Sequence, residues 1–156
     1  MNSEELTDYN INETNITLFN NKNIQSRIQT YTYNNTISNT TATGSYLISL
    51  NEKFSWGVFN LYMVKCNFYI QKDLSDNIAY YNISEQGSRL DPTCMFPASK
   101  TSVNDSCNWI YLTSKNIANG NGLRYILDCY DKSNNLLNID INKLKTYVEV
   151  KIYPII

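Results

Sequence analysis

The chain has 156 residues, of which 42% are hydrophobic and 13% aromatic, and this is enough apolar material for one domain with its own core. The formal net charge is −1, and the basic residues stand singly apart from the pair Lys143 and Lys145, which excludes the electrostatic footprint expected of nucleic-acid binding. Histidine is absent, so Ser-His-Asp and Cys-His catalysis and His-ligated metals are excluded as well.

Residues 1–42 are predicted to be an acidic arm rich in Asn and Thr, with one or two strands at 16–19 and 27–33. Four acidic residues precede Lys22, the first basic residue. No signal peptide is visible and no stretch is apolar enough for a transmembrane segment. The default expectation is a cytoplasmic location, unless the chain is the mature form of a secreted protein.

Residues 43–156 are predicted to form an all-β domain of about nine short strands with little helix, arranged as a sandwich or barrel. Alternation of apolar and polar residues indicates strands, and the clearest is 146–153, with Val148, Val150 and Ile152 facing inward. The turn sequence 119–122 predicts a hairpin between the strands 108–113 and 123–130. The other expected elements are strands at 46–50 and 58–70, a loop at 86–103 and a helical turn within 140–145.

Two segments of the domain share a pattern in which a strand and a polar gap lead to a second strand ending in cysteine. The strand ending at Cys66 resembles the strand ending at Cys129. The pattern predicts a pseudo-symmetric domain with repeat one at about 43–85, a loop at 86–103 and repeat two at about 104–153. The alternative is chance similarity between two amphipathic hairpins.

The four cysteines are Cys66, Cys94, Cys107 and Cys129. They contain no Cys-x-x-Cys pair, and without histidine no metal site is expected. The repeat makes Cys107 and Cys129 the best candidates for a disulfide. Buried thiols are the alternative, favoured by the absence of a signal peptide.

Carboxylate pairs are the one catalytic arrangement that the composition allows. The candidates are Asp73 with Asp76 and Asp128 with Asp131. The first pair fits a turn, and the second pair points to opposite faces of a strand. We therefore predict that the chain is not an enzyme and has no cofactor. Abundant Asn, Ser, Thr, Asp and Tyr instead suit hydrogen bonding to, and stacking on, sugars.

The second repeat resembles the cyanovirin-N homology family of lectins. The matching residues are Ser106, Cys107, Ile110, Leu112, Leu123, Cys129, Ile139, Asp140 and Asn142. The resemblance implies a two-repeat all-β fold that binds glycans beside each cysteine pair. It places carbohydrate-binding residues at Asn104, Asp105, Ser106, Asp131 and Lys132, with Ser45 and Asn67 as first-repeat equivalents. The first repeat departs from the family because Tyr46 stands where a cysteine is expected.

The predicted function is a non-enzymatic, lectin-like carbohydrate-binding domain whose partners are glycans or glycoproteins. The alternative is a structural or assembly subunit, such as a coat, fibre or toxin-complex component, that acts through protein partners or self-association. Self-association of the purified chain favours the alternative, whereas two similar sugar sites favour the lectin.

Overall fold

The computed structural model describes residues 29–34, 37–50, 61–86, 88, 90–114 and 123–155. The predicted strand 16–19, the turn 119–122 and most of the arm lie outside them. The elements are β1 Gln29–Asn34, β2 Ile37–Asn39, β3 Ser45–Ser49, β4 Tyr62–Gln71, η1 Leu74–Asp76, β5 Tyr80–Glu85, β6 Thr93–Pro97, β7 Asn104–Thr113, β8 Arg124–Tyr130, η3 Ile141–Lys143 and β9 Lys145–Pro154. The prediction of an all-β fold with about nine strands and little helix is confirmed.

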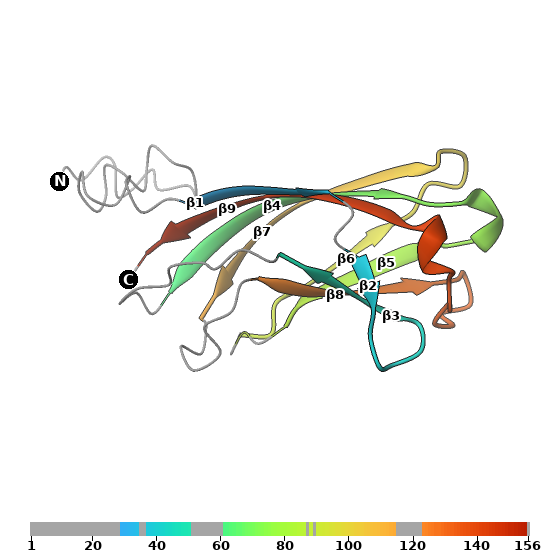
Figure 1. Ribbon diagram of the computed structural model, residues 1–156, viewed down its shortest axis with the longest axis horizontal. Helices are drawn as coiled ribbons and strands as arrows, with labels where there is room; N and C mark the ends of the chain where they lie inside the picture. The colour runs from blue at the N-terminus through green and yellow to red at the C-terminus, as the bar shows by residue number, and fades with distance from the viewer. Residues whose placement is uncertain are drawn as a thin grey trace.

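The strands form two antiparallel sheets that face each other as a sandwich (Figure 1). One sheet has four strands in the order β1-β9-β4-β7, and the other has five in the order β2-β3-β8-β5-β6. The alternation of apolar and polar residues along a strand turns one face of each sheet toward the core. In β9, Val148, Val150 and Ile152 are almost fully buried between the sheets, as predicted.

The core between the sheets is rich in aromatic side chains. Phe68 of β4 meets Tyr125 of β8 edge to face, with ring centroids 5.0 Å apart. The hydroxyls of Tyr111 and Tyr125 are 2.7 Å apart, so these buried phenols satisfy each other across the sandwich. Trp109 of β7 is also buried in this cluster.

The predicted hairpin between 108–113 and 123–130 is wrong. β7 pairs with β4 in the four-stranded sheet, whereas β8 pairs with β3 and β5 in the other sheet. The two strands face each other through Tyr111 and Tyr125 instead of lying side by side. In the first predicted repeat, β3 and β4 likewise lie in different sheets.

The prediction of a loop over 86–103 is wrong at Thr93–Pro97, which form the strand β6. β6 pairs with β5, and it turns Cys94 and Phe96 inward and Thr93 and Met95 outward. The strand is only five residues long and ends at Pro97, which hides its alternation. The predicted helical turn within 140–145 is confirmed by η3.

Candidate functional site

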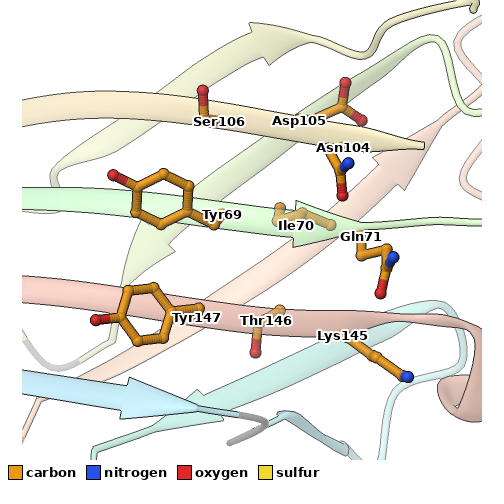
Figure 2. A pocket seen from close by; sticks show the side chains of 9 residues that line it. All are labelled: Tyr69, Ile70, Gln71, Asn104, Asp105, Ser106, Lys145, Thr146 and Tyr147. Carbon is orange, nitrogen blue, oxygen red and sulfur yellow. The ribbon is translucent and has the colours of Figure 1, made fainter. Parts of the chain in front are cut away.

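Two tyrosines lie side by side on the outer face of the four-stranded sheet. Tyr69 of β4 and Tyr147 of β9 are Cα partners in the antiparallel register. Their ring centroids are 5.6 Å apart at an interplanar angle of 48° (Figure 2). Both rings project outward because the alternate residues Ile70, Thr146 and Val148 face the core.

Polar side chains surround the two rings and complete what we call the tyrosine face, formed by Tyr69, Gln71, Asn104, Ser106, Lys145 and Tyr147. These residues line a shallow depression of about 420 Å³. Figure 2 shows Gln71, Asn104 and Lys145 gathered at one end of the rings. Burial, and then the neighbouring Glu149, raise the pKa of Tyr147 above its usual value. Aromatic rings edged by amides, a hydroxyl and an ammonium suit binding through stacking and hydrogen bonds.

A buried ion pair fixes the start of β7 beside this face. The Lys72 ammonium donates to the Asp105 carboxylate at 2.7 Å and to the Ser102 carbonyl oxygen at 2.7 Å. The same carboxylate accepts the Tyr81 hydroxyl at 2.5 Å and the Ser99 backbone N–H at 2.7 Å. Because these contacts hold Asp105 inward, its neighbours in the strand, Asn104 and Ser106, face outward.

The structure separates the predicted carbohydrate-binding residues into several places. Asn104 and Ser106 lie on the tyrosine face, whereas the carboxylate of Asp105 is engaged with its buried partners. Asp131 and Lys132 line a different depression, of about 580 Å³. A backbone hydrogen bond from Asn135 lowers the pKa of the Asp131 carboxyl.

The first-repeat equivalents lie apart from both depressions. The Ser45 hydroxyl donates to the Asp128 carboxylate at 2.5 Å, which joins β3 to β8. Asn67 lies on the outer face of the four-stranded sheet, where it pairs with Asn108 and Glu149. The Tyr46 hydroxyl, at the position of the expected cysteine, is buried and bonds the backbone of Ile139.

The candidate disulfide between Cys107 and Cys129 is not present in the structure. All four are free thiols in the structure. Cys107 belongs to the four-stranded sheet and Cys129 to the other, and the sulfur of Cys107 instead lies 3.4 Å from that of Cys94. The sequence pattern around Cys107 does not indicate Cys94 as its neighbour, because Cys94 lies in β6, a segment predicted to be a loop.

The carboxylates considered for catalysis are engaged in local structure. Asp73 caps η1 by accepting the Ser75 backbone N–H, and Asp128 accepts the Ser45 hydroxyl. Within the described residues, no group of three His, Cys, Asp or Glu side chains is placed to hold a metal ion. In the same part of the chain, no helix has the length and apolarity needed to cross a membrane.

The edge strand β7 of the four-stranded sheet is long, and two large apolar side chains are exposed on its outer face. Its outward row, which we call the β7 edge, is Asn104, Ser106, Asn108, Ile110 and Leu112. Ile110 is 50% exposed and Leu112 41%. Backbone N–H and C=O groups of alternate residues on an edge strand point away from the sheet and can pair with another strand.

The other edge strands are shorter than β7. β7 has ten residues, whereas β1 has six, β6 has five and ends at Pro97, and β2 has three. Short strands, prolines and outward charges are the usual protections of an edge. β7 has no proline, and its outward row carries no charge.

No family model matches the chain, and no curated protein matches it. Several solved structures are similar to it. The PRD1 vertex protein P5 has a TM-score of 0.43 and 12% identity, and the match covers 83% of this chain and 73% of that one. Tomato aspermy virus has a TM-score of 0.43 and 6% identity, with 83% and 79% covered. The coat protein dimer of tobacco streak virus has a TM-score of 0.37 and 9% identity, with 83% and 86% covered. Similarities of this size assign no function to this chain.

Proposed function

We propose that the chain is a non-enzymatic structural subunit that assembles with further copies of itself, by strand pairing along the β7 edge. The observation that carries the proposal is the ten-residue edge strand with exposed Ile110 and Leu112. An edge of this length, without proline or outward charge, is a template for an added strand.

A second copy is the occupant that the residues of the β7 edge favour. Antiparallel pairing of β7 with its own copy brings identical rows together, and the outward row is uncharged, so no like charges oppose each other in any register. Such a contact has two-fold symmetry, the commonest symmetry of protein dimers, and would join two four-stranded sheets into one continuous sheet.

The experiment is light scattering after gel filtration, over a range of concentrations, on three proteins. The wild type is expected to exceed the 18.0 kDa of one chain, whereas Ile110→Lys is expected to run as a monomer. The lysine replaces an apolar side chain of the outward row by a charge, and it brings a positive charge from each copy to the paired strands. Leu112→Lys is a second variant with the same expected effect.

Met95→Lys is the matched control, because Met95 is also exposed and outward on an edge strand, but on the short β6. It should associate as the wild type does. A monomeric wild type, or association that survives both Ile110→Lys and Leu112→Lys, would overturn the proposal. Circular dichroism checks that each variant keeps its strands.

Glycan binding at the tyrosine face is a second candidate, favoured by the paired rings of Tyr69 and Tyr147 beside Asn104 and Gln71. Aromatic faces pack on the apolar faces of sugar rings, while amides and hydroxyls bond their hydroxyl groups. The test is a glycan array with Tyr147→Ala. Tyr80→Ala is the control, since Tyr80 stacks on Tyr130 in the other sheet. Binding lost in the first variant alone supports this function, and no binding by the wild type rejects it.

A further inference from the structure

Two of the four cysteines face each other where the edge strands β6 and β7 meet. The sulfur atoms of Cys94 and Cys107 are 3.4 Å apart, and both side chains are only partly buried. By contrast, Cys66 and Cys129 are fully buried in the core. The pair therefore differs from the other thiols both in its geometry and in its access to solvent.

The two thiols are within hydrogen-bonding distance of each other. A disulfide bond is about 2.0 Å long, so closing it needs the sulfurs to approach by roughly 1.4 Å. The two strands lie at the edges of different sheets, and among the described residues each has a hydrogen-bonded neighbouring strand on one side only. Small rotations of the two side chains are thus less constrained here than in the centre of a sheet.

We infer that Cys94 and Cys107 are a reversible disulfide site, which covalently joins the two sheets when a small-molecule disulfide oxidises it. The Cys94 thiolate attacks the oxidant, for example oxidised glutathione, and releases one glutathione thiolate. Cys107 then attacks the Cys94 sulfur and releases the second glutathione. Two protein thiols become one disulfide, and the oxidant takes both electrons and both protons as two glutathione thiols.

The surroundings indicate which cysteine reacts first. Cys94 is itself only partly buried, so the oxidant can reach its sulfur from solvent. Burial, and then the hydrogen bond with Cys94, raise the pKa of Cys107 to about 12. Cys107 therefore attacks second, once the mixed disulfide beside it holds the target sulfur in place and the leaving glutathione takes its proton.

The bond would close a loop that contains the contacts ordering the start of β7. The two cysteines are 13 positions apart, and Ser99, Ser102 and Asp105 lie between them. A loop of this length constrains the unfolded chain, so oxidation is expected to raise the melting temperature by about 5–10 °C. Dithiothreitol should reverse the rise.

Trypsin offers a direct test on the full chain, because the four cysteines fall in four different tryptic peptides, 66–72, 90–100, 101–115 and 125–132. The protein is incubated with oxidised glutathione, denatured, alkylated and digested without reduction. The expected product is peptide 90–100 linked to peptide 101–115, two hydrogens lighter than their sum, with the other two peptides alkylated. Four alkylated peptides, a link from Cys107 to Cys129, or a lasting glutathione adduct on Cys94 would overturn the inference.

Cys94→Ser and Cys107→Ser are the matched variants, since each keeps a small polar side chain. Neither should show the rise in melting temperature on oxidation. A rise of the same size in either variant would show that the effect arises elsewhere in the chain. The peptide map of the wild type decides the question even if the variants fold poorly.

Discussion

The carboxylate of Asp105 lies at the start of β7 and holds three segments of the chain together. Its partners come from the end of β4, from β5 and from the turn before β7, namely Lys72, Tyr81 and Ser99. Burial and the hydrogen bond to this carboxylate raise the pKa of Tyr81 well above its usual range. A buried charge with this many donors is costly to disturb, since each donor would lose its partner away from water.

Asp105→Asn is expected to destabilise the fold by about 3 kcal/mol, because it leaves the buried Lys72 ammonium without its counter-charge. Tyr81→Phe removes one hydroxyl donor and keeps the ion pair, so it should cost only about 1 kcal/mol. Urea unfolding measures both. Equal losses in the two variants would contradict the central role of the ion pair.

Buried acidic groups make the fold sensitive to alkaline pH. Burial, and then the neighbouring Asp128, raise the pKa of the Cys129 thiol to about 12. Burial likewise raises the pKa values of Tyr111, Tyr125 and Cys66. In each case the folded pKa lies above the unfolded one, so the contribution to stability is complete below the unfolded pKa and is lost as pH rises toward the folded pKa.

The free energy of unfolding should therefore fall above about pH 9 for each of the two thiols and above about pH 10 for each of the two tyrosines, by about 1.4 kcal/mol per pH unit and group. Urea unfolding of the reduced protein at several pH values measures the slope. In Cys129→Ala, the free energy of unfolding should fall less steeply with pH, by the roughly 1.4 kcal/mol per pH unit that one group contributes. An unchanged slope in this variant would mean that Cys129 does not contribute.

Among the elements, the turn between β2 and β3 depends on one glycine. Gly44 has φ +85°, and a side chain there would come within 3.1 Å of Leu136. Gly44→Ala should cost about 1–2 kcal/mol through the strained backbone and this close approach. The neighbouring exposed change Thr43→Ala should stay within about 0.5 kcal/mol. Thermal unfolding of both variants checks the difference, and a neutral Gly44→Ala would contradict it.

Strands with strict alternation could be predicted from the sequence, but their partners could not. β9 was recognised from Val148, Val150 and Ile152, because burial of one face follows from a period of two. The same period appears in β7 and β8 whether they pair or face each other across a core. The predicted hairpin therefore failed, and the Cys94–Cys107 contact was not anticipated.

The tyrosine face shows the same limit at a candidate site. Asn104 and Ser106 were singled out through the lectin resemblance, but Tyr69 and Tyr147 were not. These rings meet only because β4 and β9 are neighbours in one register. Their outward positions in two alternating strands were the available signal, and it becomes informative only once the pairing is known.

For the whole molecule, the outer face of the four-stranded sheet offers two separable surfaces. The tyrosine face lies at the end where β7 begins, while Ile110 and Leu112 lie toward the other end of that strand. The two surfaces share Asn104 and Ser106, but Ile110 and Leu112 belong to the β7 edge alone, and Tyr69 and Tyr147 belong to the tyrosine face alone. Variants at Ile110 and Tyr147 distinguish the two.

The most direct test of assembly is hydrogen–deuterium exchange at low and high protein concentration, measured by mass spectrometry. In a single chain, the outward backbone amides of β7 exchange freely, whereas strand pairing protects them. We predict that protection of 104–113 rises with concentration and that protection of 93–97, the edge strand β6 of the other sheet, does not change. A β7 segment whose exchange is unchanged at concentrations where the protein associates would contradict the proposed assembly.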